Sequence, residues 1–147
     1  MKTNNICFKV KSISLVIVAV MSMSLFSSCS HKVSFLNSSV VPAARGSVKV
    51  SRDNNKNYVV KINIYNLAEV SRLQPPKKCY VVWMITDKQE IRNIGQIKSA
   101  EAMLSSKLTA YYESVSSFKP VRIFITAEDD ASATNPDPTT VLSTNNF

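Results

Sequence analysis

The chain has 147 residues, of which 45% are hydrophobic and 19% charged, with two glycines, six prolines and three cysteines. This composition is typical of a folded domain and excludes a collagen-like, a disordered or a disulfide-rich chain. The formal net charge of +8 would suggest a nucleic acid partner for a cytoplasmic protein. The N-terminus, however, predicts export, and there the available anions are lipid headgroups and envelope polymers. We therefore expect no nucleic acid partner.

Residues 1–28 are organised like a secretory signal peptide. Three lysines precede an apolar run over 13–26, and no acidic residue occurs before Asp53. A basic segment, an apolar stretch of roughly 7–15 residues and small residues before a cleavage point define such a signal. A membrane-spanning helix needs about 20 apolar residues, and this run is shorter. We predict a signal peptide over 1–28.

The five residues that end at Cys29 resemble the lipobox of bacterial lipoproteins. In that motif small residues precede a cysteine that is acylated and becomes the new N-terminus, and Phe26 replaces the Leu, Val or Ile that the motif prefers. Each buried CH₂ of an acyl chain contributes about 0.8 kcal/mol, so two or more chains on Cys29 would hold the protein on a membrane. The alternative is a simple secretory cut that leaves Cys29 as a free thiol.

The residues after Cys29 bear on localisation and on disulfides. Ser30, His31 and Lys32 lack the acidic run that marks surface-exported lipoproteins in some bacteria. We therefore expect a lipid-anchored protein of the cell envelope that faces the periplasm. With Cys7 removed and Cys29 alkylated, one cysteine remains and no intramolecular disulfide is expected. This third cysteine, at position 79, is expected to be a small buried hydrophobe rather than a reactive thiol.

Residues 30–44 predict a tether between the lipid and the domain. They are rich in serine, their apolar residues follow no sustained period, and they end on Pro42-Ala43-Ala44. About 15 flexible residues span on the order of 20 Å. The predicted organisation is a signal peptide over 1–28, a lipidated cysteine and tether over 29–44, and one domain over 45–147. That domain is long enough for a single core.

Alternation of polar and apolar residues recurs through the domain and predicts half-buried strands. Residues 79–86 differ, because both alternating sets are apolar or aromatic, and they predict a central strand covered on both faces. Within it Trp83 is expected to plug the core with its N–H hydrogen-bonded, the alternative being a tryptophan that stacks on a ligand. The other predicted strands are 47–51, 58–67, 91–97, 109–115, 121–127 and 140–144.

The connections complete the fold prediction. Residues 67–78 contain Pro75-Pro76, and Leu67 and Leu73 are expected to pin this connection to the sandwich edge. Gly95 predicts a bulge or a close backbone approach, and 99–106 favours a single helical turn. Seven short strands without a sustained helical period predict an all-β fold, a single antiparallel immunoglobulin-like β-sandwich.

Short motifs follow one another in a characteristic order along 45–147. They are Gly46-Ser47-Val48-Lys49-Val50, the segment 60–67, Pro75-Pro76, Tyr80-Val81-Val82-Trp83-Met84, Ile94-Gly95-Gln96, Phe124-Ile125-Thr126-Ala127-Glu128, Pro138 and Val141-Leu142. In this order they resemble the extracytoplasmic C-terminal domain of RskA-type anti-sigma-K factors. That family carries a sigma-binding segment and a membrane-spanning helix before this domain, where we expect a signal peptide and a lipobox. The resemblance therefore implies the outer domain alone, displayed on a lipid anchor.

Patterns of catalytic or metal-binding residues are weak. His31 is the only histidine and falls in the predicted tether, so no zinc site is expected. Residues 128–130 with Asp137 could hold calcium, but the spacing of a calcium loop is lacking and a solvated acidic loop is the preferred interpretation. There is no Gly-x-Ser-x-Gly motif, no recognisable carboxylate pair and no phosphate loop. We expect no catalytic residue, no metal and no cofactor.

Three hypotheses of function follow. The first is a non-catalytic lipoprotein whose sandwich binds an envelope protein, with a regulatory or sensory role by analogy with the family. The second is a module that binds a glycan or another envelope polymer through exposed tyrosines among Tyr58, Tyr65, Tyr111 and Tyr112, unless these pack in the core and across strands. The third is a cryptic enzyme, which requires a cleft with converging polar groups. Tyr111 and Tyr112 are the predicted ligand or partner surface.

Overall fold

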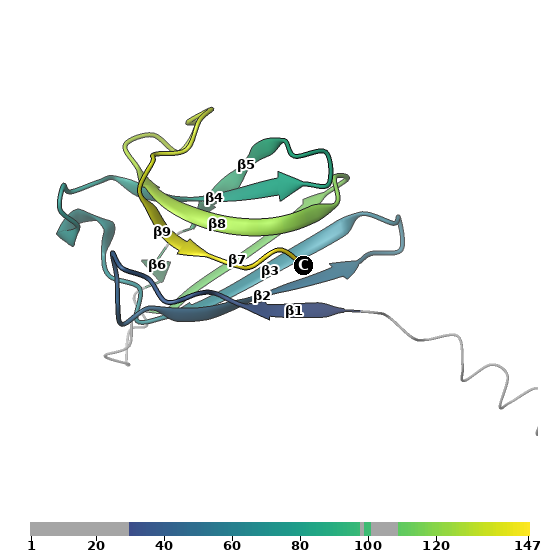
Figure 1. The fold of residues 1–147 in the computed structure, drawn as a ribbon, viewed down its shortest axis with the longest axis horizontal. Coiled ribbons are helices and arrows are strands. Elements are labelled where there is room, and N and C mark those ends of the chain that lie inside the picture. Colours follow the sequence, from purple (N-terminus) through teal and green to yellow (C-terminus); the bar gives the residue numbers. More distant parts are fainter. Residues whose placement is uncertain (1–29, 98, 101–108) are drawn as a thin grey trace, which may run out of the picture.

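Two antiparallel sheets pack face to face in the computed structural model, which describes residues 30–97, 99–100 and 109–147 (Figure 1). The five-stranded sheet has the order β1 (His31–Ser34), β2 (Arg45–Arg52), β3 (Tyr58–Tyr65), β7 (Thr109–Ser116) and β6 (Ser99–Ala100). The four-stranded sheet has the order β5 (Ile91–Ile97), β4 (Cys79–Thr86), β8 (Pro120–Glu128) and β9 (Thr140–Ser143). The predicted all-β antiparallel sandwich is confirmed, and each of the seven predicted strands is present.

The hairpin of β2 and β3 shows how the sequence pattern produces the five-stranded sheet. Val60, Ile62 and Ile64 of β3 are buried between the sheets, while the residues between them face outward. The turn that joins the strands is held by Asp53, whose Oδ1 accepts hydrogen bonds of 2.8 Å from the backbone N–H groups of Asn55 and Asn57. Alternation and turn chemistry thus specify the same hairpin.

Strand β4 is buried on both faces, as its composition predicts. Tyr80, Val82 and Met84 belong to the core between the sheets. Trp83 belongs to a second apolar cluster on the outer side of the four-stranded sheet, together with Phe124 of β8 and the partly buried side chains of the loop after β8. The indole is fully buried, so Trp83 is a core residue and not a ligand platform.

Residues 30–44 are not the tether that the sequence predicts. Strand β1 pairs antiparallel with β2, Val33 opposite Val48. Phe35, which directly follows β1, is buried and forms an isolated antiparallel β-bridge with Thr144. Its backbone N–H donates to the carbonyl of Gly46 at 3.0 Å. The prediction failed because β1 is an edge strand stabilised by pairing with its neighbour, which a search for apolar periods does not detect. The folded domain therefore includes the residues directly after Cys29.

Gly95 takes the unusual conformation that the sequence predicts. Its φ is +132°, and the pairing of β4 with β5 shifts register between Val82 and Trp83, opposite this glycine. A Cβ atom at Gly95 would lie 2.7 Å from the hydroxyl oxygen of Tyr112. The glycine therefore allows both the bulge and the close packing of Tyr112. Most of the helical turn predicted over 99–106 lies outside the described residues, and its first two residues form β6.

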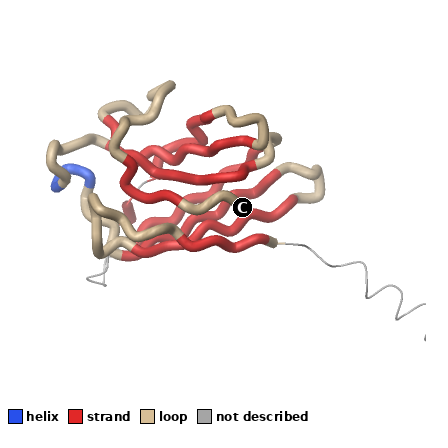
Figure 2. The backbone as a smooth tube through the Cα atoms, in the orientation of Figure 1, coloured by secondary structure: helices blue, strands red, loops and turns tan. Residues whose placement is uncertain are grey.

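The connections of the sandwich differ between its two ends. Because the strands are antiparallel, the connections 35–44, 66–78 and 129–139 gather at one end, which we call the long-loop end (Figure 2). The turns 53–57 and 87–90 lie at the other, the short-turn end, where the chain also enters β1. None of the helices in the described residues is long or apolar enough to cross a membrane.

Candidate functional site

Two adjoining cavities form a groove at the long-loop end. Their volumes are about 280 and 520 Å³, and both are lined by Val40, Leu73, Gln74 and Thr139. These residues come from three separate connections. The smaller cavity extends to Val141 of β9, so its floor is continuous with the core. We call this feature the distal groove.

The wall contributed by the β1–β2 connection is held by local hydrogen bonds. The backbone N–H of Val41 donates to Ser38 Oγ at 2.9 Å. The guanidinium of Arg45 donates to the carbonyl oxygens of Pro42 and Ala44, each at 2.7 Å. These bonds fix the local conformation of this wall.

The opposite wall comes from the β3–β4 connection. Its short helix η2 (Val70–Arg72) is followed by the buried Leu73, and Leu67 is buried before it, so both leucines pin this connection as predicted. The hydroxyl of Tyr80 donates to the carbonyl of Ala68 at 2.9 Å. Burial raises the pKa of Tyr80 to about 12, so the hydroxyl remains a donor well above neutral pH.

Charged residues border the groove at both ends. Lys77 Nζ lies 2.9 Å from Asp129 Oδ2 and 3.2 Å from Asp137 Oδ2. Hydrogen bonds to these carboxylates, first that to Asp129, raise the pKa of Lys77. The pKa of Asp137 is lowered, chiefly by the backbone N–H of Thr139. At the other end Arg72 is exposed and pairs with Glu69, 2.9 Å away. The groove thus joins an apolar floor to a charged rim.

The acidic loop after β8 is not simply solvated. Glu128 is only 7% exposed. Its Oε1 accepts hydrogen bonds from the hydroxyl of Thr126 and, at 2.8 Å, from the backbone N–H of Asp137. Asn93 Nδ2 donates at 2.9 Å to carbonyl oxygens at both ends of the segment 131–133. The loop is folded onto the outer side of the four-stranded sheet, because Asn93 of β5 and the buried carboxylate of Glu128 both hydrogen-bond to its backbone.

Tyr111 and Tyr112, the predicted ligand or partner surface, lie on opposite faces of the five-stranded sheet. Tyr111 is 52% exposed on the outer face of the five-stranded sheet. Tyr112 is half-buried, packs against the core and donates its hydroxyl to the carbonyl of Ile94. The prediction for Tyr112 is wrong because neighbouring strand residues point to opposite faces. Tyr65, which is 51% exposed, takes its place beside Tyr111.

Tyr111 is part of a polar cluster with Lys61 and Glu113. Its hydroxyl donates to Glu113 Oε2, while Lys61 Nζ lies 3.0 Å from Glu113 Oε1. The hydrogen bond from Tyr111, followed by that from Lys61, lowers the pKa of Glu113. The same carboxylate raises the pKa of Lys61 and of Tyr111. Glu113 therefore stays ionised and holds both neighbours in place.

The remaining candidates for chemistry are placed apart from one another. Cys79 is buried, and burial raises the pKa of its thiol, which disfavours the nucleophilic thiolate. His31 lies on β1, where its ring is 5.7 Å from that of Phe147. Within 30–97, 99–100 and 109–147 no group of three or more His, Cys, Asp or Glu side chains is arranged to hold a metal ion.

Comparison with known proteins gives no match: no family model, curated protein or solved structure matches this chain.

Proposed function

We propose that the protein is a non-catalytic lipoprotein of the cell envelope, anchored through acyl chains on Cys29, whose sandwich binds a protein partner in the distal groove. The observation that carries this proposal is the position of the groove. It lies at the long-loop end, whereas the chain that follows Cys29 enters the sandwich at the short-turn end. A lipid on Cys29 would thus leave the groove facing away from the membrane.

The composition of the groove supports a protein as its ligand. Protein interfaces combine an apolar centre with a polar rim. Here Val40, Leu73 and Val141 supply the centre, and Lys77 and Arg72 supply cations at the rim. Both cations already pair with carboxylates, Lys77 with Asp129 and Asp137 and Arg72 with Glu69, so the rim presents charges of both signs to a partner. An apolar side chain of the partner would fill the floor.

A regulatory role is part of the same proposal. The order of motifs along 45–147 resembles the outer domain of RskA-type anti-sigma-K factors, and in such regulators the outer domain is the part available to envelope partners. On this chain the domain would receive an envelope protein.

Site-specific crosslinking in living cells tests the proposal. A photo-crosslinking amino acid replaces the exposed Gln74 in the groove, and the matched control carries it at the exposed Asn55 of the short-turn end. We expect one defined protein adduct from position 74 and none from position 55. Val40→Asp should abolish the adduct by charging the floor, while Val40→Thr should retain it. No adduct from position 74, or the same adduct from both positions, contradicts the proposal.

The lipid anchor has a separate test. Wild-type protein should fractionate with membranes and incorporate an alkyne-labelled fatty acid. The Cys29→Ala variant should do neither. A Cys29→Ala variant that remains acylated contradicts lipidation at Cys29.

A further inference from the structure

The outer face of the five-stranded sheet carries three lysines in register. Lys32 of β1 is opposite Lys49 of β2, and Lys49 is opposite Lys61 of β3. Directly opposite residues on antiparallel strands have Cα atoms about 4.5–5.5 Å apart. The three side chains therefore form a row of positive charges across three strands, which we call the lysine row.

The lysine row is only partly neutralised. Lys61 pairs with Glu113 at 3.0 Å. In the described part of the chain Lys32 and Lys49 form no ion pair. Like charges directly opposite one another destabilise a sheet. A ligand with repeated negative charges would relieve this repulsion.

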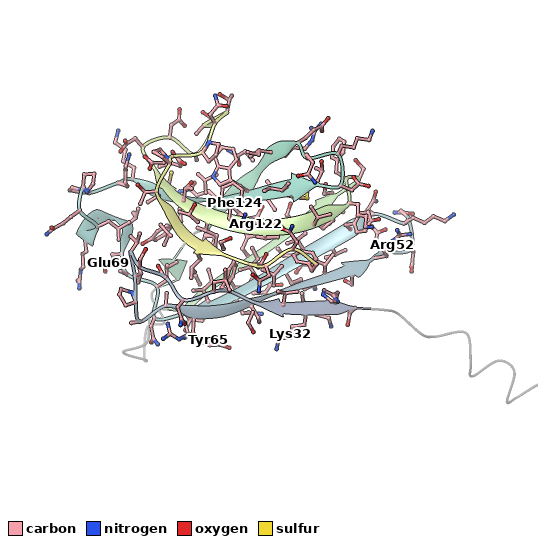
Figure 3. All side chains as sticks on the ribbon, in the orientation of Figure 1. Lys32, Arg52, Tyr65, Glu69, Arg122 and Phe124 are labelled. Carbon is pink, nitrogen blue, oxygen red and sulfur yellow. The ribbon has the colours of Figure 1, made fainter. Side chains whose placement is uncertain are left out.

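Two exposed aromatic rings lie on the same face. Asn63 is opposite Tyr111, and Tyr65 is opposite Thr109, so the two tyrosines occupy diagonal positions across β3 and β7. Such positions are about 7–8 Å apart. Figure 3 shows Tyr65 and Lys32 projecting from the outer side of the sheet. Each tyrosine presents a flat apolar ring with a polar edge. The exposed Asn63 is directly opposite Tyr111 and two residues before Tyr65.

We propose that this face binds an acidic polysaccharide built of uronic acid sugars, with its carboxylates on the lysine row and its sugar rings on Tyr65 and Tyr111. Charges and rings that are spread over several strands suit an extended chain with repeating contacts better than a small anion. Polyphosphate would satisfy the lysines but offers no apolar face for the rings of Tyr65 and Tyr111 to contact. The choice of a polysaccharide over a nucleic acid rests on the export predicted from residues 1–28.

Binding by the full-length chain, purified from membranes in detergent, tests this proposal. The probes are polygalacturonate, its fully methyl-esterified form, which keeps the sugars but removes the charge, and single-stranded oligothymidine. We expect binding to polygalacturonate that weakens with salt, and no binding to the ester. Lys32→Ala with Lys49→Ala should weaken binding about tenfold. Tyr65→Ala with Tyr111→Ala should weaken it by a similar factor.

The matched control removes two charges elsewhere. Lys88→Ala with Lys119→Ala lowers the net charge equally but changes exposed residues of the short-turn end, and it should bind polygalacturonate like the wild type. Three outcomes overturn the proposal: no binding to polygalacturonate, equal loss in both lysine pairs, or equal binding of oligothymidine. The groove variant Val40→Asp should bind normally, so failure here is distinct from failure of the proposed protein partner.

Discussion

The indole nitrogen of Trp83 donates a hydrogen bond of 2.8 Å to the hydroxyl oxygen of Thr126. That hydroxyl donates in turn to the buried carboxylate of Glu128, which also accepts the backbone N–H of Asp137. A chain of three hydrogen bonds thus joins the central strand β4 to the loop that ends beside the distal groove. We expect disturbance of Thr126 to affect both core stability and groove shape.

Thr126→Val should destabilise the protein by about 2 to 4 kcal/mol, because it leaves a buried indole N–H and a buried carboxylate without their shared partner. Thr126→Ser keeps the hydroxyl, and it should cost about 1 kcal/mol through the lost methyl group. Urea denaturation measures both changes. Equal effects of the two variants would mean that the hydroxyl contributes nothing to stability.

Gly95→Ala should destabilise the sandwich by about 1 to 3 kcal/mol, because φ at this position is +132° and the new methyl group would approach Tyr112. Tyr112→Phe in the same chain removes the oxygen that the methyl group meets and should restore part of the loss. Thermal denaturation of both single variants and the double variant measures the coupling. A Gly95→Ala variant as stable as the wild type would contradict the described bulge.

Tyr80 should make stability fall at alkaline pH. Burial raises its pKa from 10.0 to about 12, so the folded state favours the protonated hydroxyl. This contribution is complete below pH 10 and is lost as pH rises from 10 toward 12. Tyr80→Phe should remove this part of the pH dependence, although it loses the bond to Ala68. The measurement is the denaturation midpoint of each protein at pH 8 and at pH 11, about one unit above the ordinary tyrosine pKa. An equal fall in the midpoint between these two pH values for the wild type and for Tyr80→Phe would contradict the prediction.

A chain that begins at residue 45 should be much less stable than one that begins at residue 30. The shorter chain lacks β1 and the buried Phe35 and Val41. Phe35→Ala in the longer chain should alone cost about 3 kcal/mol. Thermal denaturation measures both effects. Equal melting temperatures for the two chains would show that residues 30–44 act as a tether after all.

The strands that face the core could be predicted because their apolar residues repeat every second position. In 58–67 this pattern alone predicts which side chains are buried, and in 79–86 the lack of alternation predicts cover on both faces. Gly95 was also predictable, since an isolated glycine in a strand has few other reasons to occur.

The remaining features depend on contacts between distant residues. On the inward face of β1 Val33 is the only apolar residue, beside Val48, so this strand has no apolar period to detect. The burial of Glu128 depends on hydrogen bonds from Thr126 and Asp137. The sequence pattern does not predict that the backbone of Asp137 folds back onto this carboxylate. Two adjacent tyrosines on a strand must face opposite ways, yet the sequence does not tell which one is exposed. The lysine row likewise depends on the register between strands.

The position of β1 has a consequence for how far the domain can reach. With acyl chains on Cys29, only one residue would separate the lipidated cysteine from the first strand. The sandwich would lie directly against the bilayer, without the flexible linker of about 20 Å that 15 flexible residues would give. Eight-residue strands span about 26 Å, so the distal groove would be held near that height. Partners would have to present their binding segment at this fixed distance from the membrane surface.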